Sequence, residues 1–89
     1  MEFEWDEAKS ARNRAERGFG FRFASRIFRG LVLEQPDVRR DYGEDRVRAI
    51  GAVEGHVLLV VYTRRGDVSR IISARPANRK ERSQWLSRE

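Results

Sequence analysis

Six consecutive apolar residues, at positions 57–62 (Val-Leu-Leu-Val-Val-Tyr), constrain the fold of this chain more than any other segment. A strand with one face in water alternates apolar and polar side chains, and this run does not alternate. Its length is typical of a strand and far too short for a membrane span. The run therefore predicts a central strand of a sheet that is covered on both faces.

Turn signals on both sides of this strand predict antiparallel neighbours. Gly55 lies in the turn before it, and Gly66 lies in the turn after it. Strands that are joined by short turns form a meander, and we expect one of three or four strands here. The segment 35–45 contains Pro36, Gly43 and four acidic residues, and it is interpreted as an exposed loop. The other expected strands are residues 2–5, 31–33, 46–53 and 68–74.

Three helices are expected around the sheet. Asp6 is placed to cap a helix that ends at Gly18. The segment 21–29 has its apolar residues on one arc of a helical wheel, and Pro76 is suited to open a last helix that continues to about residue 87. Residues 1–89 are therefore expected to form a single α+β domain. It would contain a small antiparallel sheet packed with two N-terminal helices and one C-terminal helix.

The choice of basic residue favours an anionic partner. The chain has 19 basic and 14 acidic residues, a net charge of +5, and only two lysines, Lys9 and Lys80. The planar guanidinium of arginine binds phosphate through two hydrogen bonds and stacks on bases. The positive charge and the excess of arginine together favour RNA as the partner.

The arginines between residues 70 and 82 form the strongest candidate site. Strand alternation predicts Arg70 and Arg75 on opposite faces, so that at least one of them approaches a covered face. A half-buried arginine must be paired or must bind an anion, because stranding its charge costs roughly several kcal/mol. Both interpretations stay open at this point. Arg79 and Arg82 add donors on one helical face nearby. The acidic residues considered as internal partners are Asp6, Glu34 and Glu81.

Other chemistry-bearing residues give weaker signals. Arg22, Arg26 and Arg29 fit the solvated face of an amphipathic helix, and His56 fits a surface turn. The acidic residues of the 35–45 loop match no known cation-binding spacing, and the chain has no phosphate-binding glycine loop. We therefore expect no metal and no cofactor. The absence of cysteine, of a signal peptide and of a long apolar segment predicts a cytoplasmic protein without membrane contact.

Motifs near both ends of the chain resemble the BrnT toxin family. The Trp-Asp-Glu-Ala-Lys opening at residues 5–9 and the Arg-Ile-Ile-Ser-Ala-Arg block at residues 70–75 are specific in combination, and the resemblance covers nearly the whole chain. It implies a RelE-like fold and a ribonuclease toxin that inhibits translation. It also implies a ribbon-helix-helix antitoxin of the BrnA type, through which alone the protein would meet operator DNA. Further matching positions are Asn13, Gly18, Phe21, Ala24, Phe28, Gly51, Tyr62 and Thr63.

The resemblance also implies site residues. The family pattern falls on Lys9, Arg46, Arg70, Arg75, Glu81 and Arg82. Metal-free RNA cleavage needs a base for the 2′-hydroxyl, cations for the charge on the phosphorane, and an acid for the leaving oxygen. We predict that Arg70, Arg75 and Arg82 surround the phosphate and that Glu81 is the base. Lys9 or Arg46 would complete the binding of the phosphate, and Arg79 would contact RNA nearby.

Two positions depart from the family pattern. Arg17 stands before Gly18 where the family usually has histidine, and Trp85 stands where it usually has tyrosine. Neither replacement transfers protons near neutral pH. The alternative function is therefore a non-catalytic protein whose arginine surface binds nucleic acid or an acidic segment of the antitoxin. A structural subunit without any nucleic-acid role is the third interpretation.

Overall fold

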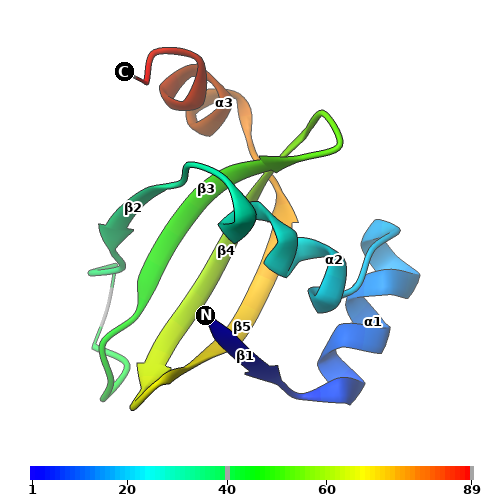
Figure 1. The fold of residues 1–89 in the computed structure, drawn as a ribbon, viewed down its shortest axis with the longest axis vertical. Coiled ribbons are helices and arrows are strands. Elements are labelled where there is room, and N and C mark those ends of the chain that lie inside the picture. The colour runs from blue at the N-terminus through cyan, green and yellow to red at the C-terminus, as the bar shows by residue number, and fades with distance from the viewer. Residues whose placement is uncertain (40, 89) are drawn as a thin grey trace.

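The computed structural model describes residues 1–39 and 41–88, which form a five-stranded mixed sheet with helices on both faces (Figure 1). The strand order is β1-β5-β4-β3-β2. No helix in these residues is long and apolar enough to cross a membrane. The α+β class is confirmed. The elements are β1 (Glu2–Trp5), α1 (Glu7–Arg17), α2 (Phe21–Ser25), the 3₁₀ helix η1 (Arg26–Arg29), β2 (Leu33–Pro36), β3 (Val47–Val53), β4 (His56–Arg65), β5 (Val68–Pro76) and α3 (Arg79–Leu86).

Strand β4 is the central strand that its unbroken apolar run predicts. Leu58 and Val60 face a core cluster that includes Phe21 of α2, and the intervening Leu59 and Val61 face a second cluster that includes Trp85 of α3. All four β4 residues are buried. The two core clusters lie on opposite faces of the sheet, since side chains alternate along a strand.

The sheet is mixed, so the expected purely antiparallel sheet is wrong. Strand β1 pairs in parallel with β5, with Glu2 opposite Val68 and Trp5 opposite Ile71. The other three strand pairs are antiparallel. Turn signals reveal only strands that are neighbours in sequence, whereas β1 and β5 are separated by most of the chain. No local sequence pattern therefore predicts the pairing of β1 with β5.

Strand β5 contains a β-bulge that changes which face its arginines occupy. Val61 pairs with Ser73 and Tyr62 pairs with Ile71, so Ile72 is an additional residue. The bulge reverses the alternation of side chains beyond it. Arg70 and Arg75 pair with Thr63 and Leu59, which share one face of β4. Both arginines therefore face the α3 side of the sheet, and the prediction of opposite faces is wrong.

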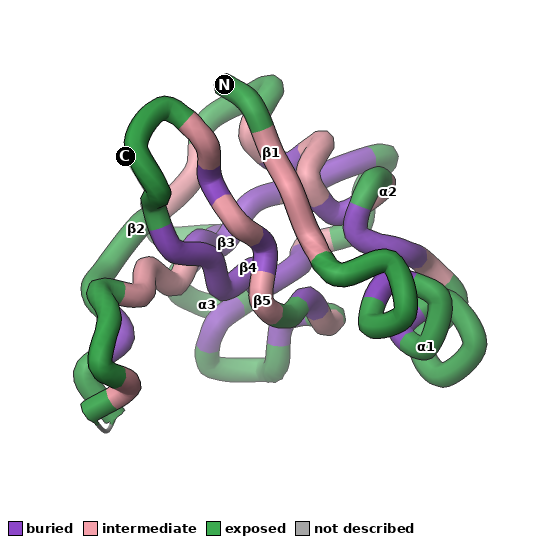
Figure 2. Tube along the Cα trace, turned by 90° about the horizontal axis from the view of Figure 1, so that it is seen from below, coloured by how far each residue is buried: buried purple, intermediate pink, exposed green. Residues whose placement is uncertain are grey.

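The first two helices follow their sequence signals with one difference. The Asp6 carboxylate accepts hydrogen bonds from the backbone amides of Ala8 and Lys9 at 2.9 and 3.2 Å, and α1 ends at Gly18 with φ 87°. Figure 2 shows that α1 is largely exposed. The expected helix 21–29 instead divides into α2 and η1. A Cβ added to Gly51 would lie 2.8 Å from Ile27, so η1 packs directly on the backbone of β3.

The last helix begins later than the proline signal predicts. Pro76 ends β5, and Asn78 caps α3. The Asn78 side chain accepts from the Glu81 amide at 2.8 Å, and the Glu81 side chain accepts from the Asn78 amide at 2.8 Å. This reciprocal capping box fixes the helix start, because it satisfies two amides that lack partners within the helix.

Candidate functional site

Glu81 organises the junction between β5 and α3. Its Oε1 accepts from Asn78 N and from Arg75 Nη1, both at 2.8 Å. Its Oε2 accepts from Arg75 Nη2 at 2.9 Å and from Arg48 Nη2 at 2.8 Å. We call these four residues the Glu81 network. Burial alone raises the pKa of Glu81, but the hydrogen bonds from Arg75 and Asn78 outweigh it and lower the pKa below its usual value. The carboxylate is ionised and holds the two arginines in position.

The two arginines of the Glu81 network are oriented before any ligand binds. The side chains of Arg48 and Arg75 are 20% and 31% exposed, so both reach the surface. Two guanidinium groups share one carboxylate and leave one positive charge in excess. The Nε of Arg48 is buried and has no hydrogen-bond partner among the described residues. A ligand would therefore have to approach the exposed edges of these guanidinium groups rather than this nitrogen.

Five other predicted site residues lie outside the Glu81 network, and Arg70, Arg79 and Lys9 are three of them. Arg70 pairs with Glu4 at 2.6 Å, and roughly 16 Å of strand separates it from Arg75. Arg79 is exposed at the first residue of α3. Lys9 is exposed on α1. The interpretation of an internal salt bridge is thus confirmed for Arg75, and its partner Glu81 is one of the acidic residues considered from the sequence. Arg70 also forms a salt bridge, but its partner Glu4 was not among those residues.

Lys9 lines a narrow cleft between α1 and the open edge of β5. Strand β1 pairs only with residues 68–71 of β5, so the later part of that strand edge has no strand partner on this side. There Arg17 Nη1 of α1 donates to the Ala74 carbonyl at 2.8 Å. The cleft has a volume of about 140 Å³ and is lined by Lys9 and Arg12 on one side and Ser73 on the other. We call it the α1–β5 cleft. It brings basic side chains to the β5 edge.

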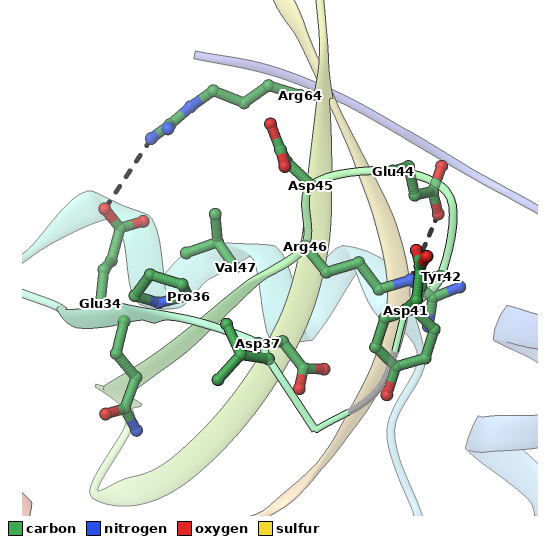
Figure 3. A pocket seen from close by; sticks show the side chains of 12 residues that line it. Glu34, Pro36, Asp37, Asp41, Tyr42, Glu44, Asp45, Arg46, Val47 and Arg64 are labelled. Atoms are coloured by element: carbon green, nitrogen blue, oxygen red, sulfur yellow. Dashed lines mark hydrogen bonds and ion pairs between the residues drawn. The ribbon is translucent and has the colours of Figure 1, made fainter.

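Arg46 lies among carboxylates in a separate pocket of about 650 Å³ (Figure 3). Its Nε donates to Glu44 at 3.2 Å, and its guanidinium lies 3.9 Å from the centre of the Tyr42 ring. The structure therefore does not join Arg46 to the Glu81 network. No group of three or more acidic or histidine side chains suited to a metal ion occurs in the described residues. We call this the acidic pocket, and its charged lining residues are Glu34, Asp37, Asp41, Glu44, Asp45, Arg46 and Arg64.

Asp37, which lines the acidic pocket, and Tyr62, which lies beside it, have shifted pKa values. Hydrogen bonds from Arg39 outweigh the opposing effect of burial and lower the pKa of Asp37. Tyr62 is buried, and its hydroxyl donates to Glu34 and accepts from Arg64 Nη2 at 2.9 Å. Burial, and then the hydrogen bond to Glu34, raise the pKa of Tyr62 to about 12. Tyr62 is therefore a poor proton donor near neutral pH.

Arg82 lines a groove at the opposite end of the sheet. The groove has a volume of about 660 Å³ and lies between the end of α1, the β3–β4 hairpin and the start of α3. Arg14, Arg17, Arg82 and His56 line it, and its wall includes Phe19. We call it the arginine groove. No carboxylate lines it, and its three arginines form no salt bridge with any residue that the structure describes.

Sequence reasoning missed several of these residues. Arg48 lies inside the predicted strand 46–53, and the argument that a half-buried arginine needs a partner would have found it. Arg14 and Arg17 look like ordinary helix-surface charges. His56 is exposed at the start of β4, as a surface position predicts, but its ring lies 6.4 Å from that of Phe23 beside the groove. Only the tertiary fold brings Arg14, Arg17 and His56 together in the arginine groove.

The two departures from the family pattern have structural roles. Arg17 donates to the Ala74 carbonyl and, at 3.5 Å, to Asn13. Trp85 is 8% exposed in the core cluster under α3, and Arg88 lies 3.7 Å from the centre of its ring. Both side chains are held by packing or hydrogen bonds, and neither supplies a proton-transfer group.

Comparison with known proteins gives one family. A family model described as "Ribonuclease toxin, BrnT, of type II toxin-antitoxin system" matches residues 5–81. The matched range includes Lys9, Arg70, Arg75 and Glu81, and it ends immediately before Arg82. A search of curated proteins found no match.

Proposed function

This chain belongs to the BrnT family of ribonuclease toxins of type II toxin-antitoxin systems, and on that premise we propose that it is a metal-independent endoribonuclease. The observation that carries the proposal is the Glu81 network. It presents two guanidinium groups whose shared carboxylate leaves one positive charge in excess. Fixed cationic donors are suited to bind the scissile phosphate and to stabilise the charge that develops in the transition state.

Within this proposal Glu81 is a positioning residue rather than the base that the sequence suggested. Both of its oxygens accept hydrogen bonds, it is 4% exposed, and its pKa is lowered. A buried carboxylate with these partners is a weak base and meets substrate poorly. Arg75 and Arg48 would contact the phosphate, and Glu81 would hold their guanidinium planes in place.

The proposed RNA path crosses the open edge of β5. Lys9 in the α1–β5 cleft lies on one side of that edge, and the Glu81 network lies on the α3 side of the sheet. Arg70, earlier in β5, and Arg79, at the start of α3, would contact phosphates on either side of the Glu81 network. Arg46 fits this path poorly, because it lies in the acidic pocket, where several carboxylates would repel RNA.

The remaining parts of the proposal follow from the family. The protein would inhibit translation by cutting RNA in the cytoplasm, and its fold would be RelE-like. A ribbon-helix-helix antitoxin of the BrnA type would bind the toxin and would carry it to operator DNA.

The test is cleavage of single-stranded RNA by the purified chain in the presence of EDTA. Replacing Arg75 by alanine removes a donor from the transition state, and we expect a loss of about 100-fold in initial rate. Arg64→Ala is the matched control, because Arg64 is an exposed arginine of the acidic pocket, and this variant should retain its rate.

The two departures from the family pattern, Arg17 and Trp85, favour a second function. They stand where the family pattern usually has histidine and tyrosine, and neither of them transfers protons near neutral pH. A non-catalytic protein would bind RNA in a salt-dependent way and leave it intact, because phosphate binding needs no proton transfer. That result would replace the endoribonuclease proposal, and the absence of any RNA binding would exclude both functions.

A further inference from the structure

The arginine groove gathers arginines that have no carboxylate partner. Eight of the described arginines form salt bridges with carboxylates: Arg26, Arg39, Arg46, Arg48, Arg64, Arg65, Arg70 and Arg75. Within the described residues, Arg14, Arg17 and Arg82 form none, and all three line one groove. The other described arginines without a salt bridge are exposed and lie outside the groove: Arg12, Arg22, Arg29, Arg79 and Arg88. Three uncompensated guanidinium groups around one opening repel each other, and a bound anion relieves that repulsion.

Neutral groups hold two of these three side chains in place. Arg17 donates to the Ala74 carbonyl at 2.8 Å, and Arg82 donates to the Ala77 carbonyl at 2.7 Å. A Cβ at Gly20 would lie 3.1 Å from Nη2 of Arg14, so the glycine gives this guanidinium its space. Backbone carbonyls fix an arginine without cancelling its charge, and each guanidinium keeps further N–H donors for a ligand.

One wall of the groove is aromatic. The Phe19 and Phe23 rings both line it, with their centres 5.8 Å apart. The His56 ring lies beside Phe23 at the rim, 6.4 Å between centres. The volume of about 660 Å³ is in the range of sites for small organic ligands. Sites for single-stranded nucleic acid combine these features, which are cationic donors for the backbone and aromatic rings for a base.

We propose that the arginine groove is a subsite for one nucleotide of single-stranded RNA, outside the Glu81 network. Arg14, Arg17 and Arg82 bind a phosphate of that nucleotide, its base lies against Phe19, and His56 donates a hydrogen bond at the rim. The inference rests on the proposed function for its choice of RNA. An acidic peptide would also satisfy the arginines, but it would not use the aromatic wall.

The experiment measures binding without cleavage. A fluorescein-labelled 2′-O-methyl hexanucleotide has no 2′-hydroxyl to attack, so anisotropy with the intact chain reports binding alone. We expect Arg14→Gln to weaken binding about fivefold and to reduce the dependence of log K on log salt by about 0.7, because one phosphate contact is lost. Phe19→Leu should weaken binding about fivefold with an unchanged salt dependence, because it removes base stacking.

Two further variants keep the test decisive. Arg22→Gln is the matched control, because Arg22 is an exposed arginine on α2 that lies outside the groove, and it should stay within about twofold of the wild type. His56→Ala changes an exposed residue, removes the hydrogen-bond donor and should weaken binding about threefold. Thermal unfolding of each variant identifies any loss that comes from misfolding, and in that case His56→Ala and Arg14→Gln decide.

The outcomes separate this inference from the proposed function. If the groove variants bind as the Arg22 control does, the subsite is wrong even when the wild type cleaves ordinary RNA. If a decaglutamate peptide displaces the oligonucleotide and Phe19→Leu binds normally, the groove is an acidic-peptide site and the inference is also wrong. If the groove variants weaken binding while wild-type protein leaves ordinary RNA intact in EDTA, the subsite stands and the endoribonuclease proposal fails.

Discussion

The arginine groove and the acidic pocket lie at opposite ends of the sheet and have nearly equal volumes, about 660 and 650 Å³. Three arginines and no carboxylate line the groove, whereas five carboxylates and two arginines line the pocket. A salt bridge joins Arg46 to Glu44 in the pocket, and Arg64 lies 3.8 Å from Glu34. Similar hollows on one fold therefore have opposite charge.

This difference shows that the net charge of +5 is a poor description of the surface. The positive charge that can attract a polyanion is concentrated at the α3 end, where arginines are held by carbonyl groups or share a carboxylate. At the other end, carboxylates repel the same ligand. Such a separation orients an approaching RNA as well as attracting it.

The largest expected effect comes from replacing Glu81, the buried carboxylate at the α3 end of the molecule. Glu81→Gln should lower the free energy of unfolding by about 2–3 kcal/mol at pH 7, because Arg48 and Arg75 lose their partner. The folded-state pKa of Glu81 is lowered, so its contribution is present above the unfolded value, 4.5, and is lost as the pH falls through the folded value. Urea unfolding from pH 7 to pH 3 measures both effects.

The matched variant for Glu81 is Glu44→Gln in the acidic pocket. The Glu44 side chain is 31% exposed, against 5% for Glu81. A partly solvated ion pair contributes little, and we expect a change of about 0.5 kcal/mol. Equal losses in the two variants would show that burial does not distinguish the two ends of the molecule.

A smaller effect concerns Tyr62 beside the acidic pocket. Its pKa is raised to about 12 from 10.0, so its contribution to stability is complete below pH 10 and is lost as the pH rises through 12. We expect the wild type to lose about 1–2 kcal/mol over this range relative to Tyr62→Phe. Chemical denaturation at pH 9, 10.5 and 12 tests this, and parallel curves for the two proteins would contradict it.

The smallest effect sharpens the electrostatic comparison. Neutralising the acidic pocket with Glu44→Gln and Asp45→Asn removes carboxylates that repel RNA. Their distance from the groove exceeds the screening length of about 8 Å at physiological salt, so we expect at most about a twofold gain in RNA affinity. The gain should disappear when salt is raised. A gain of tenfold would place RNA at the pocket itself.

The fold was predictable where signals are local. The unbroken run in β4 predicted a strand covered on both faces, and Asp6 and Gly18 predicted the limits of α1. The parallel pairing of β1 was not predictable, because no turn links Trp5 to its partner Ile71. The bulge at Ile72 also lacks a local signal, since isoleucine is equally common in regular strands.

The candidate site was predictable only where its residues are close together in the sequence. Arg75 and Glu81 are close in sequence, and the charge in an apolar strand indicated that they interact. Arg48 joins them from another strand, and the arginine groove combines α1, a hairpin and α3. Such combinations depend on how elements pack, and a pattern along one element does not contain that information.

The bulge at Ile72 also limits how the length of the chain can vary. Because one additional residue in β5 sets both Arg70 and Arg75 on the α3 side, deleting a single residue there would turn one of them toward the core around Phe21. Substitutions within β5 change one side chain at a time, whereas a deletion reverses a whole segment. Insertions and deletions should therefore be tolerated in the segment 41–44 and excluded between residues 70 and 75.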